Sequence, residues 1–440
     1  MKFIHTADIH LDSPLRGLES YPDAPVEALR LATRKAFDRV IDLCLSEEVD
    51  FLLIAGDLFD TDVKDFNAAL AAASQLRRLD QANIPVYLIL GNHDSRQEMT
   101  RHVPWPANVT LFNHKKPETI RHPTLPVAIH GMSYPQREVN ENLVPDYPDP
   151  VAGCFNIGLL HTNAVGTKQH ASYAPCTVQE LIAKGYDYWG LGHVHDFKVL
   201  HPHPAVVYSG NTQGRNIRET DRKGCVLVTV NDVGEPAGIE FRETDLARWF
   251  YETIELSPED DVDGLVEAVR NRLRDVMKAA QGRTAAVRLE LTGRCLAHAS
   301  LTGDFEKQQL TTTLRGLASD LGEGLWIEKI RFQTQSPLDL DGLRERQDLL
   351  GELLREIESI ASDPVPLQMF PEAQDLMTKL AADLPPQPEG EDAFNLNDPE
   401  RQQRWLRDAE AILLSHLVQE SDAQQLGVLQ RGTQHQEVQP

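Results

Sequence analysis

Five short motifs carry side chains that can bind metal ions, and they occur in a fixed order along the chain: ADIH, GDLFD, GNHD, GLLHT and GLGHVHD. Each ends or follows a run of apolar residues. One such motif alone is weak evidence, because short patterns of this kind also arise by chance. All five together predict one shared site. Its ligands would come from the polar side chains of these motifs, which include Asp8, His10, Asp57, Asp60, Asn92, His93, Asp94, His161, His193 and His195.

The chemistry of these ligands indicates the kind of ion. Carboxylates, imidazoles and one amide oxygen suit divalent ions such as manganese, iron or zinc. The five cysteines form no CxxC pair, which argues against a structural zinc site. Seven ligands from this set, shared by two ions, leave positions open for water and phosphate oxygens. Two ions about 3.5–4 Å apart can activate water and hold a phosphate for in-line displacement, so the motifs predict two-metal hydrolysis of a phosphoester.

The elements that must position these residues alternate between strands and helices. Residues 2–9, 49–57 and 84–94 have the apolar runs of strands that end in polar loops, and residues 26–48 and 65–80 have helical spacing. This βαβαβ beginning predicts a sheet with helices packed on it. Ligands bind at the carboxyl ends of strands in open α/β sheets, so separate strands can deliver Asp, Asn and His to one cavity. Further apolar runs follow at 126–130, 155–161, 186–193, 205–209 and 224–230.

Two more regions follow this first one. Residues 246–336 have the pattern strand, helix, strand, helix, strand, which predicts a small α+β domain. Residues 337–420 begin with an amphipathic helix at 340–361 and continue through a Pro-rich linker to a second helix at 398–420. The Gln-rich end, 421–440, is predicted to be disordered.

The net charge of −24 is unusual for a protein that binds nucleic acid, because Lys and Arg supply most of the nonspecific affinity for phosphates. The charge is uneven, since residues 337–440 hold 21 acidic and 8 basic residues, a net charge of −13. Some of the remaining acid belongs to the candidate metal ligands. A polyanionic substrate is therefore not excluded, but metal ions or a partner would have to hold much of its phosphate.

The sequence has no signature of a membrane or secretory protein. No apolar stretch reaches about 18 residues, so no transmembrane helix is expected. The beginning, MKFIHTADIH, lacks the basic and then apolar run of a signal peptide. Five scattered cysteines fit reduced thiols. We therefore predict a cytoplasmic protein without membrane contact.

The motifs resemble those of the calcineurin-like metallophosphoesterase superfamily over about residues 1–230. More narrowly, HTADIHLDSPL, AGDLFDT, LGNHD, HGMSY and YSGNTQGRNIRE resemble SbcD-type DNA-repair nucleases, especially their bacterial YhaO-like branch. The resemblance implies an α/β fold. Its parts would be a metallophosphoesterase β-sandwich flanked by helices at 1–245, a small α+β capping domain at 246–336 and a helical partner-binding region at 337–420.

The resemblance also implies how the ligands are shared between two divalent ions, with manganese the expected metal. One ion would be held by Asp8, His10 and His195, the other by Asn92, His161 and His193, and Asp57 would bridge them.

A catalytic pair follows from the same resemblance. His93 would face the scissile phosphate and protonate the departing oxygen, with Asp94 orienting its ring. Some related nucleases have a histidine at the end of the GDLF motif, where this chain has Asp60. Asp60 is therefore left out of the expected catalytic set.

Two kinds of residue are candidate substrate contacts. Arg215 and Arg218 are one kind, because Arg pairs well with phosphate, and an ordinary salt bridge is the alternative. Tyr208 is the other, and its ring could stack on a substrate or simply pack in the core.

The implied function is a two-metal DNA nuclease in DNA repair or processing, an exonuclease with endonuclease activity as a further option. Its partners would be DNA, an SMC-like ABC-type ATPase bound through the C-terminal helices, and a second copy of the chain. A phosphatase or cyclic-nucleotide phosphodiesterase could use the same metal centre, but neither needs the cap-like region or the helical tail. A non-catalytic subunit of an ATPase complex would not need an intact ligand set.

Overall fold

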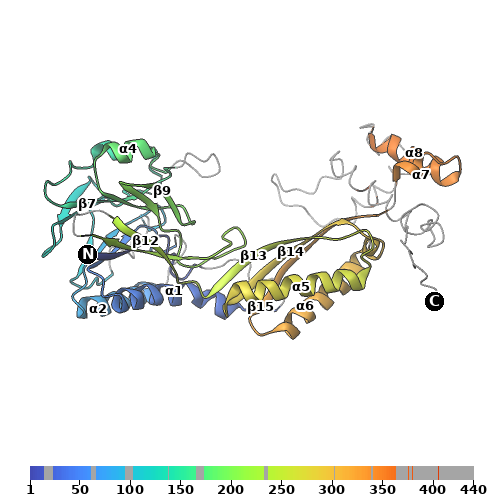
Figure 1. Cartoon of the computed structure of the whole chain (residues 1–440), viewed down its shortest axis with the longest axis horizontal. Helices are drawn as coiled ribbons and strands as arrows, with labels where there is room; N and C mark the ends of the chain where they lie inside the picture. Colours follow the sequence, from blue (N-terminus) through green and yellow to red (C-terminus); the bar gives the residue numbers. More distant parts are fainter. Residues whose placement is uncertain are drawn as a thin grey trace, which may run out of the picture. The chain divides into compact units, whose positions relative to one another are not determined.

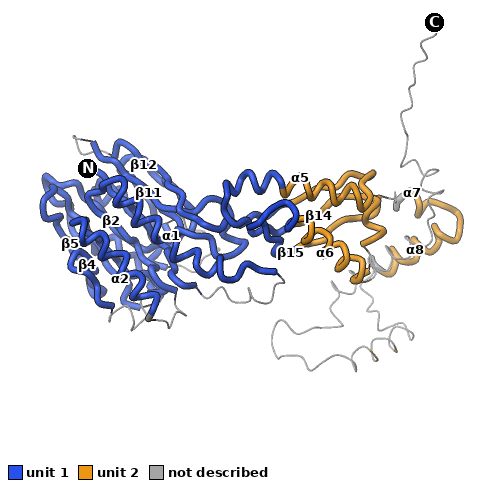
Figure 2. The backbone as a smooth tube through the Cα atoms, turned by 90° about the horizontal axis from the view of Figure 1, so that it is seen from below, with its two compact units in different colours: residues 1–252, 274–288, 318–329 blue, residues 253–273, 289–317, 330–440 orange. Residues whose placement is uncertain are grey.

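The computed structural model describes residues 1–13, 23–60, 66–94, 103–136, 138–164, 173–231, 236–301, 303–337 and 340–362, with single positions at 375, 379 and 405. These residues belong to two units (Figure 2). Unit 1 comprises residues 1–252, 274–288 and 318–329, and unit 2 comprises residues 253–273, 289–317 and everything from 330 onward.

The first large sheet of unit 1 has six strands (Figure 1). They are β1 (Lys2–Thr6), β2 (Phe51–Ala55), β3 (Val86–Ile89), β4 (Val109–Leu111), β11 (Gly224–Val230) and β12 (Pro236–Glu243). Their order is β12-β11-β1-β2-β3-β4. Strands β1 to β4 are parallel, whereas β11 is antiparallel to both of its neighbours. The carboxyl ends of β1, β2 and β3 therefore share one edge.

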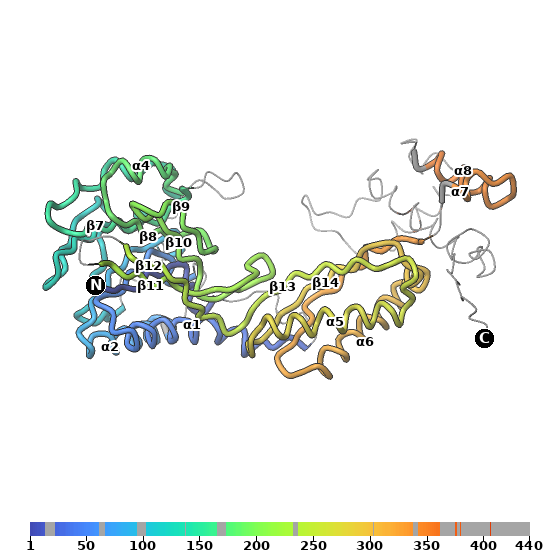
Figure 3. Tube along the Cα trace, in the orientation of Figure 1, coloured from blue at the N-terminus to red at the C-terminus, as the bar shows by residue number. Residues whose placement is uncertain are grey.

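The second large sheet also has six strands (Figure 3). They are β5 (Glu118–Arg121), β6 (Val127–Gly131), β7 (Phe155–His161), β8 (Tyr188–Gly192), β9 (Lys198–Pro202) and β10 (Ala205–Tyr208). Their order is β5-β6-β7-β8-β10-β9. Strands β6, β7, β8 and β10 are parallel, and the two edge strands β5 and β9 are antiparallel to their neighbours.

The two sheets pack on each other around a shared apolar core. Phe3 and Phe51 of the first sheet and Ile157 and Tyr188 of the second belong to one buried cluster. The rings of Phe3 and Phe51 stack with centroids 4.9 Å apart, and Tyr188 lies edge-on to Phe3 at 5.2 Å. This sandwich, with helices on its sheets, confirms the predicted α/β fold class.

Helices α1 (Val26–Ser46) and α2 (Phe66–Gln81) cover the other face of the first sheet. Alternate residues of β2 pack into two different apolar cores, one on each face of the first sheet. Leu52 packs under the helices, whereas Leu53 faces the second sheet. Burial on both faces explains why this strand is a continuous apolar run. The outer face of the second sheet is covered by the segment that includes the 3-10 turn η3 (Val144–Asp146) and by α4 (Val178–Ala183).

The region predicted as a small α+β domain has the expected five elements. They are β13 (Ala247–Glu255), α5 (Val262–Ala280), β14 (Thr284–Arg294), α6 (Asp304–Leu321) and β15 (Leu325–Gln335), with a 3-10 turn η4 (Leu296–Leu301). The strands form a separate sheet of order β13-β14-β15. Residues of all five elements occur in both units, because the division between the units cuts through each of them.

The helix predicted at 340–361 is in fact two helices, α7 (Leu340–Arg344) and α8 (Leu349–Ser362). Asp348 causes the break, because its carboxylate accepts a hydrogen bond from the Gly351 amide at 3.0 Å and so caps a new helix. The predicted Pro-rich linker, the helix at 398–420 and the C-terminal tail lie outside the described residues, apart from the single positions. Among the described helices, none is long and apolar enough to cross a membrane.

His5 provides a test of the sandwich core. Its ring is fully buried and its Nδ1 lies 3.0 Å from the Tyr188 hydroxyl. Burial lowers the pKa of His5 from 6.5 to about 3. The unfolded chain therefore binds a proton between these values that the folded chain does not, and stability falls as the pH drops through that window.

We expect His5→Gln to lose less stability than wild type between pH 7 and pH 5, by roughly 2 kcal/mol at about 1.4 kcal/mol per pKa unit. The free energy of unfolding in urea, followed by tryptophan fluorescence, measures this. The exposed His114 provides the control variant, His114→Gln. Equal pH dependence in His5→Gln and wild type would show that the His5 ring is not held neutral in the core.

Candidate metal centre

The predicted ligands follow the carboxyl ends of five strands that belong to both large sheets. Asp8 and Asp57 lie two residues after β1 and β2, and Asn92 lies three residues after β3. His161 is the last residue of β7, and His193 and His195 follow β8. The Asp8 amide donates to the Gly56 carbonyl at 3.0 Å, and the His10 amide donates to the Asp57 carbonyl at 3.0 Å. These bonds hold the first two loops against each other.

One group of three ligands is Asp8, His10 and His195. One ligand atom from each lies within 4.8 Å of the other two. His195 Nε2 is 3.8 Å from Asp8 Oδ1, and the rings of His10 and His195 have centroids 5.3 Å apart. The same three residues were expected to hold the first metal ion, and the structure places them together.

The second expected group surrounds His161. Its Nε2 lies 3.0 Å from the Asn92 side-chain oxygen and 3.4 Å from Asp57 Oδ2, and its ring centroid is 5.3 Å from that of His193. Asp57 Oδ2 is also 3.9 Å from His10 Nε2. One carboxylate thus reaches both groups, as a bridging ligand must.

The donor atoms of these groups fit metal ions. Both ring nitrogens of His10 are buried and make no hydrogen bond. Burial, together with the positive charge of Arg215, lowers the pKa of His10 well below its usual value, so the ring is neutral. A buried polar atom left without a partner costs about 1–3 kcal/mol. Neutral imidazole beside buried carboxylates is a ligand set for divalent ions.

The backbone at the centre is strained at the ligands themselves. Asp8, His10, Asp57 and His193 have φ angles of 50°, 47°, 52° and 98°, in the left-handed region that side chains other than glycine rarely adopt. Such conformations cost about 1–3 kcal/mol each and cluster at functional sites.

Close packing also explains a glycine of the GNHD motif. A Cβ atom on Gly91 would lie 2.2 Å from Asp57 Oδ1. Only a residue without a side chain leaves room for the shared carboxylate.

His93 lies beside the ligands but differs from them in exposure. Its side chain is 30% exposed, whereas the side chains of His10 and His161 are fully buried. Its Nδ1 lies 3.0 Å from Asp60 Oδ1. Burial alone would lower the pKa of His93, but the hydrogen bond to Asp60 and the charge of Asp57 outweigh burial and raise it. A partly exposed imidazole with a raised pKa is placed to protonate a departing oxygen.

The prediction that Asp94 orients the ring of His93 is wrong. Asp94 does not orient its ring, because the Asp94 carboxylate accepts hydrogen bonds from the amides of Leu58, Phe59 and Gly91 at 3.1, 2.8 and 3.1 Å. Asp94 therefore shapes the loop after β2. Asp60, left out of the expected set, is the carboxylate that orients His93, and Ser13 Oγ holds Asp60 by donating to its Oδ2 at 2.8 Å.

Arg215 enters the centre as an ion-pair partner. It lies 3.3 Å from Asp60 Oδ2 and 2.9 Å from Glu219 Oε1, and its side chain is only 14% exposed. Glu219 also lies 2.8 Å from His195 Nδ1. A carboxylate on one nitrogen fixes the ring so that the other nitrogen faces the metal position. Sequence reasoning missed Glu219, although it ends the quoted stretch YSGNTQGRNIRE.

Tyr208 is a core residue of the second sheet. Its side chain is completely buried, and its hydroxyl donates to the Thr162 carbonyl at 2.8 Å and accepts from the Ala164 amide at 2.8 Å. Both partners follow His161, so Tyr208 supports the loop after β7. The prediction of a substrate-binding role is wrong, because no ring face is accessible.

The fold and this ligand cluster define a class of metal-dependent phosphoester hydrolases. Residues 1–197 match the family of calcineurin-like phosphoesterases, and residues 249–335 match the middle domain of the metallophosphoesterase YhaO. A Bacillus subtilis (strain 168) relative, described as the uncharacterized metallophosphoesterase YhaO, is 36% identical over 297 residues, which cover 67% of this chain and 72% of the relative. The chain belongs to the YhaO family of metallophosphoesterases.

Two solved structures are also similar in part. One is a Thermus thermophilus protein with 13% identity and a TM-score of 0.30, covering 52% of this chain and 93% of that one. The other is a dimetal phosphatase from Danio rerio with 11% identity and a TM-score of 0.32, covering 53% and 93%. Both scores are too low to support an inference.

The pairing of His93 with Asp60 predicts different effects for two carboxylates. We expect Asp60→Asn to lower kcat on a small chromogenic phosphodiester on the order of 10²-fold, because the acid loses its orienting partner. Metal content should stay unchanged. Asp94→Asn should instead lower the free energy of unfolding, with a smaller effect on kcat. Steady-state kinetics, metal analysis and urea unfolding of both variants test this.

Two results would contradict this assignment. The first is a larger loss of kcat in folded Asp94→Asn than in Asp60→Asn. The second is a loss of metal in Asp60→Asn, because His10, Asp60 and His93 also lie close enough to hold an ion.

Proposed function

We propose that the protein is a manganese-dependent DNA nuclease, an exonuclease with endonuclease activity on suitable ends. The observation that carries the proposal is the partly exposed His93 paired with Asp60 beside the metal-ligand cluster. An alkoxide leaving a phosphodiester needs a proton, and a positioned imidazole can supply it. Divalent ions bound there would supply Lewis acidity and a nucleophile at neutral pH.

Other residues of the site hold the ligands and the His93–Asp60 pair in position. Glu219 fixes the His195 ring, and Asp57 joins the two ligand groups. Arg215 neutralises Asp60 on the side away from His93, because it pairs with Oδ2 while His93 meets Oδ1. The His93–Asp60 pair therefore keeps its orientation while His93 gives up and regains its proton.

DNA as substrate is supported by features beyond the metal centre. The motifs resemble those of SbcD-type nucleases, and the chain continues into the β13–β15 region, which a small-substrate phosphatase does not need. The net charge of the whole chain is −24, so metal ions and a partner would contribute much of the affinity for phosphates.

The partner we propose is an SMC-like ABC-type ATPase that docks on the C-terminal helices, within a complex that contains two copies of this chain. Helix α8 supports this proposal. Leu354 and Leu343 pack inside the helical pair, whereas Leu349 at the start of α8 is 82% exposed. Helix α8 is amphipathic, and its apolar side would form the contact with the ATPase.

We expect the purified protein with manganese to degrade end-labelled DNA, and we expect His93→Ala to lose on the order of 10²-fold or more in rate. Metal content should be unchanged in the variant. Gel analysis of single- and double-stranded substrates measures the rate, and His203→Ala, on an exposed histidine, is the matched control.

A small chromogenic phosphodiester should be assayed beside the DNA. Cleavage of the small diester without cleavage of DNA, even with the ATPase present, would refute the nuclease assignment and favour a small-molecule phosphodiesterase.

A further inference from the structure

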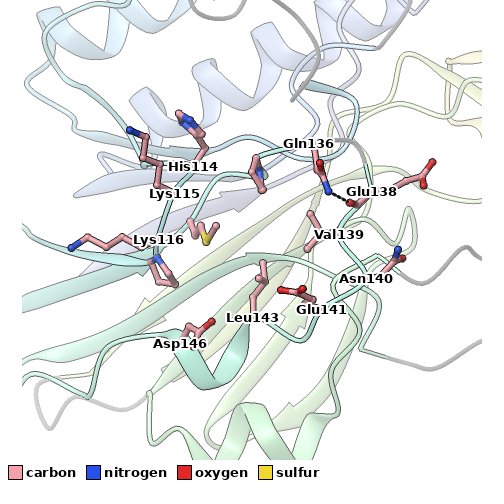
Figure 4. Close-up of a pocket in the computed structure, with 13 residues that line it drawn as sticks. His114, Lys115, Lys116, Gln136, Glu138, Val139, Asn140, Glu141, Leu143 and Asp146 are labelled. Carbon is pink, nitrogen blue, oxygen red and sulfur yellow. Dashed lines mark hydrogen bonds between the residues drawn. The ribbon is translucent and has the colours of Figure 1, made fainter.

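A pocket of about 810 Å³ lies beside the carboxyl end of β4 (Figure 4). It is formed by the loop between β4 and β5 and by the segment after β6. Pockets of roughly 300–1,000 Å³ are typical of small-ligand and subsite binding. Neither the metal ligands nor the His93–Asp60 pair line it.

One side of the pocket is basic. His114, Lys115 and Lys116 follow one another in the β4–β5 loop, and all three are exposed (Figure 4). Among the described residues, no carboxylate oxygen lies within 4.0 Å of either lysine nitrogen. Both ammonium groups therefore lie at the solvent-exposed rim of the pocket. They are available to an anionic group.

The other side carries hydrogen-bond acceptors. Figure 4 shows Glu138, Asn140 and Glu141 across the pocket from Lys115, and a third carboxylate, Asp146, below Lys116. Carboxylates accept hydrogen bonds from exocyclic amino groups of bases, such as N4 of cytosine. A ligand that matches both sides is negative at one end and donates hydrogen bonds at the other.

Hydrogen bonds connect the pocket to the metal centre. Ser133 accepts from the Leu90 amide at 3.0 Å and donates to the Phe112 carbonyl at 2.7 Å, so it joins the ends of β3 and β4. The next residue, Tyr134, lies edge-on to the ring of His161 at 5.6 Å. Met132, which precedes Ser133, lines the pocket. The segment 132–134 thus reaches from the pocket to a metal ligand.

We propose that this pocket is a subsite for a flanking nucleotide of a polynucleotide substrate. Lys115 and Lys116 hold its phosphate, and Glu141 accepts a hydrogen bond from the amino group of its base. This inference rests on the proposed function, because it assigns the pocket to the strand that His93 cleaves.

The test reverses the charge of the lysines in the full-length chain. Binding of a fluorescein-labelled, single-stranded oligo-dC is followed by fluorescence anisotropy with manganese in the His93→Ala background, so that the metal ions stay bound while cleavage is slow. We expect K115E/K116E to weaken binding about tenfold or more. The slope of log K against log salt should become shallower by about 0.7, because the two lysines hold one phosphate and each phosphate contact on a single strand contributes roughly 0.7.

The control variant K35E/K278E changes the net charge equally. Lys35 and Lys278 are exposed on helices α1 and α5 and do not line the pocket. It should bind oligo-dC within about twofold of wild type. K115E/K116E should hydrolyse the small chromogenic diester at the wild-type rate, which also shows that it is folded. Unchanged oligonucleotide affinity in K115E/K116E would overturn the subsite.

The failure of this inference is distinguishable from failure of the proposed function. If wild type cleaves DNA but K115E/K116E binds it normally, the subsite is wrong and the nuclease stands. If binding depends on the lysines but manganese produces no cleavage, the pocket stands and the nuclease assignment fails.

A second arm tests the acceptor side. Wild type should bind oligo-dC more tightly than oligo-dT, because thymine has no exocyclic amino group. The variant Glu141→Ala should reduce that difference. Equal affinity of wild type for both strands would overturn the role of Glu141.

Discussion

The metal centre depends on one buried carboxylate, that of Asp57. Its Oδ2 lies 3.4 Å from a nitrogen of His161 in the second sheet and 3.9 Å from a nitrogen of His10 after the first strand, and its Oδ1 accepts from the His93 amide at 2.9 Å. A buried charge costs several kcal/mol unless groups around it compensate. The surrounding loops are therefore held to positions that supply this compensation, and Gly91 leaves the necessary space.

The sandwich makes this arrangement possible because it brings the carboxyl ends of strands from two sheets to one edge. The first sheet supplies Asp8, Asp57 and Asn92, and the second supplies His161 and His195. Packing of the apolar faces of the two sheets against each other stabilises the arrangement in which the ligand-bearing loops lie side by side. The apolar core thus offsets both the buried charge and the left-handed backbone at the ligands.

Much of this centre could be predicted from the sequence, because its ligands sit in short motifs at the ends of strands and strand ends converge. The wrong or missed predictions concern contacts between residues that lie far apart in the sequence, which the sequence alone does not show. His93 neighbours Asp94 in the chain, yet its ring meets Asp60 from another loop. Glu219 reaches His195 only after the chain has crossed two strands. Tyr208 has the composition of a contact residue, but its strand is buried on both faces.

The central claim is that one carboxylate joins two metal sites, and a count of bound metal tests it most directly. Isothermal titration of the metal-free protein with manganese should give two ions per chain. In Asp57→Asn both ions should bind at least about tenfold more weakly, whereas Asp42→Asn, on an exposed carboxylate, should match wild type. Two ions bound to Asp57→Asn with unchanged affinity, or a single ion bound to wild type, would contradict the shared-ligand account.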